Sequence, residues 1–548
     1  MKEHFNKKNL IINLFAVPLI IYTIYLLCTM LSSTVLTSQY PNEYREAANI
    51  QMTRSILAGD NPYSLDSLSD ETPGVFYLYG PLMSLIAAFI AWIVPVDVVI
   101  IHYAIAFAAM VISGMLIGKI IYDHCNSITA PIAGFLFTIM CHWRYGYIFA
   151  APDSLGLMIL ILILFILTRP KFQYKAFTCA ALTVAVFFTK QYYFMIFGTT
   201  FAYFLFLSKK ETMKYVISTI LIFMTCGILI AWKFPLFFTY AIYFVKGPGA
   251  GVSSGKAGTT HNTMQITYLG GMFIAFFIVG AYDIIRTVVF KRNIAIKWKW
   301  KKPDLPLFKI EVKEEEKVYG KRKIVCDLLF WGQMAAGALV LQYIGKNDGA
   351  FLSYYLQLFL PALIVVSLTA IDNYKFKKAG NYILYICYAL LLLFTIVKTD
   401  SRLIVNQYSN EDMKAWEQAY TIMDEYADQE VYEIPAVAYK GFEQNKYVYN
   451  NGQPFVITDS YLEQYKKNEL AQTLFPYAGQ IMEQHLNYRQ EVLRKVRNGE
   501  YALVTDLKDA DVIFTEEDLQ CYYKKRDTLS LKTGNWSWDI DFWVKKGQ

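Results

Sequence analysis

Charged residues are scarce in this sequence. Asp, Glu, Lys and Arg make up 18% of the 548 residues, whereas hydrophobic residues make up 55% and the mean hydropathy is +0.29. This balance favours a multispanning membrane protein over a chain of soluble domains. The basic residues behind the net charge of +7 sit in short loops and form no continuous stripe, which excludes nucleic acid as the expected partner.

Disulfide frameworks, metal-ligand spacings and internal repeats are also missing. The eight cysteines are scattered, and only Cys521 falls in the polar C-terminal part. This pattern excludes a disulfide framework, and no compact ligand cluster requires a divalent metal. Because many transporters are built from repeated halves, the lack of a repeat argues against that class.

Long apolar segments fill most of residues 1–399. They predict an α-helical polytopic membrane protein with about 11 to 13 transmembrane helices, since a spanning helix needs about 20 apolar residues. The candidate spans lie near 10–34, 79–96, 98–120, 127–141, 153–168, 176–189, 191–208, 214–232, 266–290, 325–344, 351–371 and 380–398. We expect a multi-pass protein of the cell membrane whose N-terminus is a retained signal anchor.

Positive charges indicate the orientation. Lysines near the N-terminus and the basic loop 291–324 should both face the cytoplasm. The first loop, 37–78, and the glycine-rich loop 245–265, expected to be mobile, then lie outside together with the C-terminal part. Counting every candidate as a span contradicts this arrangement. We therefore expect that one short segment between 127 and 207 does not span, or that a span is hidden elsewhere.

Residues 400–548 are polar and mix two patterns. The amphipathic helical stretch EDMKAWEQAYTIMDEYA is followed by the strand-like runs VYEIPAVAY, PFVITD, YALVTDL, DVIFT and WSWDIDFWVKK. The alternation predicts one small extracytoplasmic α/β domain. It shows no catalytic motif, so we expect it to bind an acceptor or cover the site; the alternative is a structural cap or a partner-binding module.

The polar stretch from Tyr40 to Pro81 separates the first two apolar segments. Loops longer than about 12 to 15 residues are usually functional or disordered. Glu43, Glu46 and Arg54 fall on an expected amphipathic helix over 42–57. A carboxylate held against apolar helices at a membrane surface loses solvation, which raises its pKa and strengthens it as a general base. The alternative is a solvated helix face with an Arg–Glu pair.

Three further residues stand out near expected span ends. Asp153 follows a proline at the head of an apolar segment, where it either takes part in chemistry or caps the helix. Arg144 is placed to approach a lipid phosphate, or it snorkels to the interface. Lys190 stands between two apolar runs, where a buried cation is costly and often functional, unless it marks a helix end. Weaker phosphate-binding candidates are Lys256 and His261 in the glycine-rich loop and Lys346.

Short motifs in the apolar part resemble those of a known superfamily. The loop acid precedes G-D-N-P-Y at 59–63, and Y-L-Y-G-P-L at 77–82 opens the next apolar segment. Together with A-P-D-S at 151–154 and T-K-Q at 189–191, they resemble the GT-C superfamily of membrane glycosyltransferases, which includes protein O-mannosyltransferases and the aminoarabinose transferases of lipid A. The resemblance covers about residues 10–400 in layout.

The resemblance implies transfer of a sugar from a polyprenyl-phosphate donor to an extracytoplasmic hydroxyl of a glycan, lipid or protein, with inversion. Superfamily members often carry Asp-Glu in the first loop where this chain has Arg45-Glu46. Glu46 is then the expected base, with Glu43 as its substitute and Asp153 as the second outer acid.

The expected substrate contacts follow from the same motifs. Arg54 and Tyr63 belong to the first loop and Tyr79 to the Y-L-Y-G-P-L motif, and Lys190, Arg144 or Lys256 would stabilise the leaving phosphate. The rival function is a transporter or flippase of lipid-linked sugars without transferase activity, which should place ionisable groups near the membrane midplane. A third is an assembly scaffold without activity.

Overall fold

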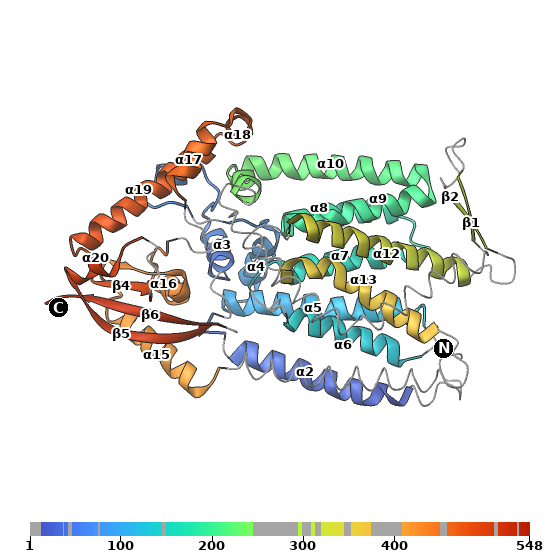
Figure 1. Cartoon of the computed structure of the whole chain (residues 1–548), viewed down its shortest axis with the longest axis horizontal. Helices are drawn as coiled ribbons and strands as arrows, with labels where there is room; N and C mark the ends of the chain where they lie inside the picture. Colours follow the sequence, from blue (N-terminus) through green and yellow to red (C-terminus); the bar gives the residue numbers. More distant parts are fainter. Residues whose placement is uncertain are drawn as a thin grey trace.

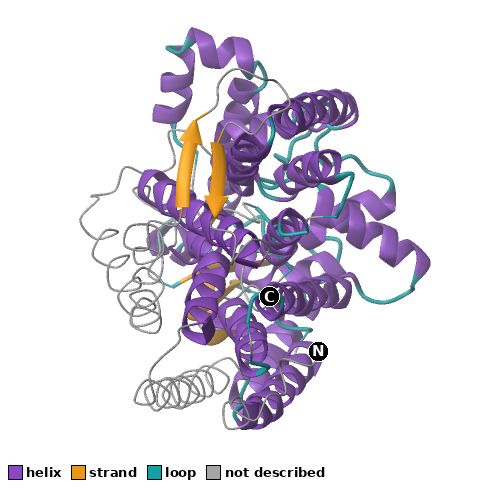
Figure 2. Ribbon diagram, turned by 90° about the vertical axis from the view of Figure 1, so that its right-hand side faces the viewer, coloured by secondary structure: helices purple, strands orange, loops and turns teal. Residues whose placement is uncertain are grey.

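Nine long helices lie side by side as a bundle in the described part of the computed structural model (Figures 1 and 2). They are α2 (Ala16–Leu36), α5 (Val98–Tyr122), α6 (Thr129–Arg144), α7 (Asp153–Leu167), α8 (Lys175–Thr189), α9 (Ile196–Leu207), α10 (Lys209–Lys233), α12 (Tyr319–Ile344) and α13 (Leu352–Asn373). The structure describes residues 13–36, 38–41, 46–74, 77–125, 127–144, 150–169, 171–244, 294–298, 308–312, 319–344, 352–373, 408–449, 457–508, 513–533 and 536–547.

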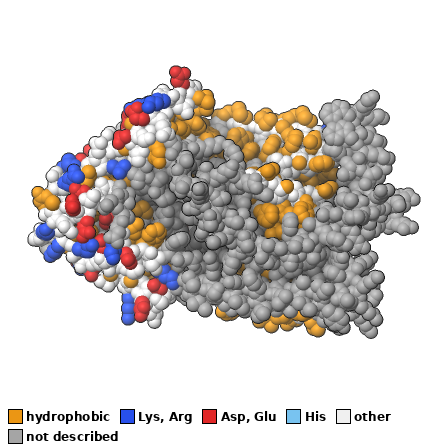
Figure 3. Space-filling view, in the orientation of Figure 1, with side chains coloured by type: hydrophobic (Ala, Val, Ile, Leu, Met, Phe, Trp, Pro, Cys, Tyr) orange, Lys and Arg blue, Asp and Glu red, His pale blue; other side chains and the backbone are white. Residues whose placement is uncertain are grey.

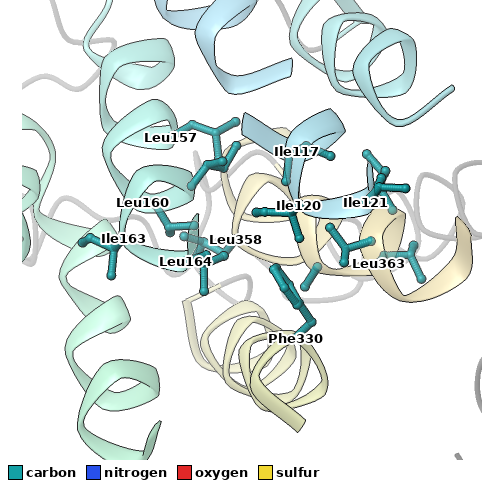
Figure 4. Packing of buried hydrophobic residues seen from close by; sticks show 14 of the residues in the cluster. Ile117, Ile120, Ile121, Leu157, Leu160, Ile163, Leu164, Phe330, Leu358 and Leu363 are labelled. Carbon is teal, nitrogen blue, oxygen red and sulfur yellow. The ribbon is translucent and has the colours of Figure 1, made fainter. Parts of the chain in front are cut away.

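The bundle is apolar inside and outside. Isoleucine, leucine and phenylalanine side chains from α5, α7, α12 and α13 interdigitate at its centre, among them Ile117, Leu160, Phe330 and Leu358 (Figure 4). Charged side chains gather instead over the C-terminal domain (Figure 3). In the described residues, α5, α10 and Ala16–Ser33 of α2 are long and apolar enough to cross a membrane, and several shorter helices are also apolar. This distribution fits a lipid-embedded bundle.

The two ends of the bundle differ. At one end, here called the domain end, lie the first loop and the C-terminal domain (Figure 1). At the opposite end lie the start of α2 and an antiparallel hairpin of β1 (Ile294–Trp298) and β2 (Phe308–Val312), in which Ile296 pairs with Ile310. The start of α2 and the β1–β2 hairpin, which belongs to the basic loop, therefore lie at the same end, as the positive charges predict.

Helix α4 (Leu82–Ile93) lies within the expected span 79–96 but does not run along the bundle. Gly80, just before it, packs against the backbone of Phe188 at the end of α8. Val98, which opens α5 after the next turn of chain, joins the buried cluster of Ala47 and Ala438 at the domain end. Helices α6, α7, α8 and α9 run along the bundle (Figure 1). Which segments cross the membrane stays a prediction.

The C-terminal part folds around a four-stranded sheet of order β3-β4-β6-β5, with β3 parallel to β4 and the other pairs antiparallel. The strands are β3 (Val431–Tyr432), β4 (Leu503–Leu507), β5 (Tyr523–Thr533) and β6 (Trp536–Lys545), and the helical elements are α15 (Asn410–Asp424), η7 (Pro435–Val437), α16 (Ala438–Glu443), α17 (Asp459–Lys466), α18 (Glu469–Leu474), α19 (Ala478–Arg497) and α20 (Glu516–Gln520). The predicted α/β domain is confirmed. Strand β5 was not expected, because its first half, KKRD, is charged and only its second half alternates between buried and more exposed residues.

The first loop carries the C-terminal domain. It contains α3 (Glu46–Ala58) and η2 (Asp66–Ser69), and Gly59 ends α3 with a φ of 87°, a conformation that favours glycine. The Tyr447 hydroxyl donates to the Pro73 carbonyl at 2.8 Å, and Gln484 Nε2 donates to the Ser67 carbonyl at 2.7 Å. The loop and the domain therefore pack as one layer across the domain end.

Candidate functional site

Glu46 is the first residue of α3 and is 1% exposed. Its Oε2 accepts hydrogen bonds from the hydroxyls of Tyr103 at 2.9 Å and Tyr439 at 2.7 Å, and its Oε1 accepts from the Ala150 amide at 3.1 Å. The donors come from α5, α16 and the segment before α7. The carboxylate thus joins the first loop, the bundle and the C-terminal domain at a single point.

The neighbours of Glu46 keep their protons. Burial and the nearby Glu46 carboxylate raise the pKa of Tyr439 well above its ordinary value of 10. The phenol therefore acts as a donor over the whole working pH range. Donors therefore reach both carboxylate oxygens of Glu46.

Asp153 and Lys190 form a buried ion pair. Asp153 opens α7 and Lys190 follows the last residue of α8, and their side chains are 4% and 3% exposed. Lys190 Nζ donates to the two Asp153 oxygens at 2.7 and 2.8 Å, and the Tyr192 hydroxyl donates to Asp153 Oδ1 at 3.1 Å. The sequence singled out both residues separately, and the structure brings them together.

The Y-L-Y-G-P-L motif is fixed against this ion pair. Lys190 Nζ lies 4.3 Å from the centroid of the Tyr79 ring, a distance at which a cation is attracted to the ring face. Gln191 Nε2 donates to the Leu78 carbonyl at 2.7 Å. A Cβ on Gly80 would lie 1.8 Å from the Phe188 carbonyl oxygen, so only glycine allows this approach. The T-K-Q motif therefore holds the second half of the first loop.

Tyr63 is a core residue rather than a side chain of the surface. It is fully buried, and its ring packs against those of Tyr77, Phe234 and Phe237 at 5.6 to 5.7 Å. Its hydroxyl donates to the Tyr79 carbonyl at 3.1 Å. Tyr63 thus supports the segment that carries Tyr79, and its expected contact with a substrate stays a prediction.

Arg54 lies on α3 away from the carboxylate of Glu46. One guanidinium nitrogen is 3.9 Å from an Asp97 oxygen, and the guanidinium carbon is 5.9 Å from the centroid of the Phe442 ring. Both partners are partly exposed, with side-chain exposures of 31% for Arg54 and 52% for Asp97. These contacts are those of a surface ion pair at the seam with the C-terminal domain.

The remaining candidates lie outside the described part of the chain. These are Glu43, Lys256, His261, Lys346 and the side chain of Arg144, whose backbone ends α6. Their expected roles stay predictions. Within the described residues, no group of three or more His, Cys, Asp or Glu side chains is placed to hold a metal ion.

The buried charged side chains of the described bundle and first loop are concentrated at one end of the bundle. Among acidic, lysine and arginine side chains there, those with less than a tenth of their surface exposed are Glu46, Asp153 and Lys190. Glu46 is hydrogen-bonded to Tyr439 of the C-terminal domain, and Lys190, which pairs with Asp153, lies against the Tyr79 ring, so the three charges lie at the domain end. A transport pathway would place such groups near the midplane of the bundle.

Sequence reasoning missed the two phenols that hold Glu46. Tyr103 lies inside an apolar segment and Tyr439 lies in a domain without a recognisable motif. The chain contains 42 tyrosines, and most are explained by the interface or the core. No local signal distinguishes these two.

Neither a protein-family profile nor a curated protein sequence matches the chain. Solved structures do share its fold. ArnT from Cupriavidus metallidurans bound to undecaprenyl phosphate aligns with a TM-score of 0.51 at 9% identity, over 96% of this chain and 97% of that chain. The apo state of ArnT aligns with a TM-score of 0.50 at 11% identity over the same shares. The apo oligosaccharyltransferase of Archaeoglobus fulgidus gives 0.50 at 11% identity, over 92% of this chain and 73% of that chain.

These likenesses concern the fold. ArnT and the oligosaccharyltransferase are both GT-C superfamily glycosyltransferases, and their alignments extend over the bundle and most of the C-terminal domain. The predicted fold class, a polytopic GT-C-like bundle with a C-terminal α/β domain, is confirmed. At 9 to 11% identity the likeness does not carry residue roles or substrates to this chain.

Proposed function

We propose that this protein is a membrane glycosyltransferase that moves a sugar from a polyprenyl phosphate to an acceptor hydroxyl at its domain end. One observation carries the proposal. In the fold shared with ArnT, the buried acid of the first loop and the Asp153–Lys190 pair lie in one layer, joined by the short segment from Ala150 to Asp153. The domain end is proposed to face the outside of the cell, since the basic segment 291–324 begins at the other end.

Lys190 is proposed to stabilise the leaving phosphate. When the sugar's anomeric C–O bond breaks, the electron pair goes to the phosphate oxygen, and a fixed cation stabilises that charge without a general acid. Asp153 holds the ammonium by both carboxylate oxygens, and the Tyr79 ring contacts it from another side. Asp153 would thus act as a positioning residue for Lys190.

Glu46 is proposed as the base, with Glu43 as its substitute. The acceptor oxygen would attack the anomeric carbon opposite the phosphate while its proton moves to a carboxylate oxygen, which inverts the configuration. The position now taken by the Tyr439 hydroxyl, 2.7 Å from Oε2, is within the reach that a general base needs. The acceptor hydroxyl would replace Tyr439 there, which gives the C-terminal domain a part in acceptor binding.

Mass spectrometry of cell-surface glycans tests this proposal without knowledge of the sugar. Deletion of the gene should remove one sugar residue from a surface glycan, lipid or protein. The wild-type chain should restore it and Glu46→Gln should not. Glu71→Gln is the matched control, since Glu71 is an exposed acid of the same loop, and it should restore the sugar fully.

Two results would overturn the assignment. Unchanged glycans in the deletion strain would argue for a scaffold or for another substrate class. In proteoliposomes, movement of a lipid-linked sugar across the bilayer without sugar transfer would support the flippase instead. If Glu46→Gln transfers normally and Glu43→Gln does not, the base is Glu43 and the reaction class stands.

A further inference from the structure

The short helix α18 presents two leucines to the outside. Leu470 and Leu474 are 68% and 60% exposed, and the one other large hydrophobic side chain of the described C-terminal domain with comparable exposure is Tyr522 at 47%. Positions four apart lie on one face of a helix. On the other side of α18, Ala471 is buried in the cluster that includes Tyr465. α18 is therefore amphipathic, and its apolar outer face is not covered by any described part of the chain.

The hairpin of α17 and α18 is held in a fixed geometry. The Tyr465 hydroxyl donates to the Phe475 carbonyl at 3.0 Å, and Gln472 Nε2 donates to the Lys466 carbonyl at 2.8 Å. Asn468 caps α18 by accepting a hydrogen bond from the Ala471 amide at 3.0 Å. Because these bonds fix the helix, the two leucines cannot turn inward without breaking the hairpin.

The position of α18 indicates what covers its leucines. Phe475 and Tyr465 pack on Tyr243, which follows α10, with ring centroids 5.4 and 5.7 Å apart. The exposed face of α10 is a belt of apolar side chains ending in Trp232, which is 80% exposed. In Figure 3 the hydrophobic surface of α10 continues onto the tip of the α17–α18 hairpin. The charged side chains of this region lie on the side that faces away from α10.

We propose that α18 inserts its leucine face into the lipid leaflet at the domain end and anchors the C-terminal domain to the membrane. The belt on α10 marks the lipid-facing perimeter of the bundle, and an aromatic side chain at its end is typical of the boundary between headgroups and acyl chains. Lys467, just before α18, is exposed and supplies positive charge for phosphate headgroups, whereas Lys466 pairs with Glu483 at 3.4 Å. This anchor does not depend on the proposed transferase activity.

Photo-crosslinking in proteoliposomes tests the anchor. The full chain carries p-benzoylphenylalanine in place of Leu474 and is reconstituted in phosphatidylcholine and phosphatidylglycerol. After illumination, intact-protein mass spectrometry should show a phospholipid adduct. The matched control carries the probe in place of Tyr522, which is exposed on the same domain before β5. We expect at least tenfold more lipid adduct at position 474 than at position 522.

Three outcomes decide the proposal. Lipid adducts at 474 and also at 470, but not at 522, support it. Equal adduct yields at 474 and 522 overturn it, because they would report random collisions with lipid. A crosslink from 474 to a second copy of the chain, in place of lipid, also overturns it and would make the leucine face a protein interface.

Discussion

Glu46 and Asp153 are buried acids in the same layer, yet they are held by opposite means. Among the described residues, Glu46 accepts hydrogen bonds from two phenols and one backbone amide. Asp153 is paired with a cation at 2.7 Å and receives one phenol in addition.

The two ways of holding a buried carboxylate suit two different roles in a reaction. A carboxylate held by neutral donors keeps its charge and can exchange one donor for a substrate hydroxyl without exposing a buried cation. An ion pair cannot release one partner so easily, because the other then remains buried and uncompensated. On this reasoning Glu46 suits proton transfer, and Asp153 suits fixing Lys190. The predictions below change the charged groups or their partners and compare the cost.

The largest effect is expected when the ion pair is broken. Lys190→Ala should lower the free energy of unfolding by about 3–5 kcal/mol, because it leaves the Asp153 carboxylate buried without its cation. Thermal unfolding of the purified chain in detergent measures the change. The exposed pair of Lys119 and Asp123 is the control, and Lys119→Ala should cost less than about 1 kcal/mol.

A double variant separates stability from chemistry. Replacing both charges, with Asp153→Asn and Lys190→Met together, should restore most of the lost stability, since a buried pair can often be replaced by neutral side chains. Sugar transfer should remain absent if Lys190 stabilises the leaving phosphate. Normal transfer by a stable double variant would show that the pair is only structural.

Glu433 is a third buried acid, and among the described residues its carboxylate has neither hydrogen-bond donors, as Glu46 has, nor a paired cation, as Asp153 has. It is 1% exposed, and neither carboxylate oxygen has a hydrogen-bond partner among the described residues. It fits against Gly441 of α16, where a Cβ would lie 2.1 Å from Oε2. Burial raises its pKa from 4.5 to about 7, and the nearby Lys446 offsets this only in part.

The raised pKa of Glu433 predicts a pH dependence of stability. The folded chain binds the proton more tightly than the unfolded chain, so stability is fully present below about pH 4.5 and declines as the pH rises through 7. The total decline is about 3 kcal/mol. Glu433→Gln should remove this slope and be more stable than the wild type at pH 8. Thermal unfolding between pH 5 and pH 8 checks it, with the exposed Glu430→Gln as control. Equal slopes in wild type and Glu433→Gln would contradict the assignment.

The parts of the site that the sequence predicts are those where one residue breaks a local pattern. Asp153 and Lys190 are visible because a charge interrupts an apolar run, and Glu46 because its loop is polar. Their partners are not predictable in this way. Tyr439 is 393 positions from Glu46, and its contact depends on how a separate domain docks. For α4, an apolar composition suits a span and a helix packed between the first loop and the bundle equally well. Only the contacts at its two ends show how it runs relative to the bundle.

A smaller effect is expected from the phenol of Tyr439. Tyr439→Phe should cost about 1.5–3 kcal/mol, since it removes a hydrogen bond to a charged group. Tyr447→Phe is the matched control, because Tyr447 joins the same domain to the same loop through a neutral carbonyl, and its cost should be about 1 kcal/mol. The apparent affinity for the acceptor should change in Tyr439→Phe alone. Equal stability and unchanged acceptor affinity in both variants would mean that the phenol neither holds Glu46 nor marks the acceptor position.

The smallest effect is expected at Arg54, which shares α3 with Glu46. Its guanidinium is 3.9 Å from Asp97 and both groups are partly exposed, so Arg54→Ala should change the free energy of unfolding by less than about 1 kcal/mol. The transfer rate should also stay within about twofold of the wild type, a change of less than about 0.5 kcal/mol in the barrier. A loss of tenfold or more in transfer, at unchanged stability and unchanged domain docking, would show that Arg54 contacts a substrate. The layer that performs the chemistry would then extend from Glu46 along α3 to the seam with the C-terminal domain.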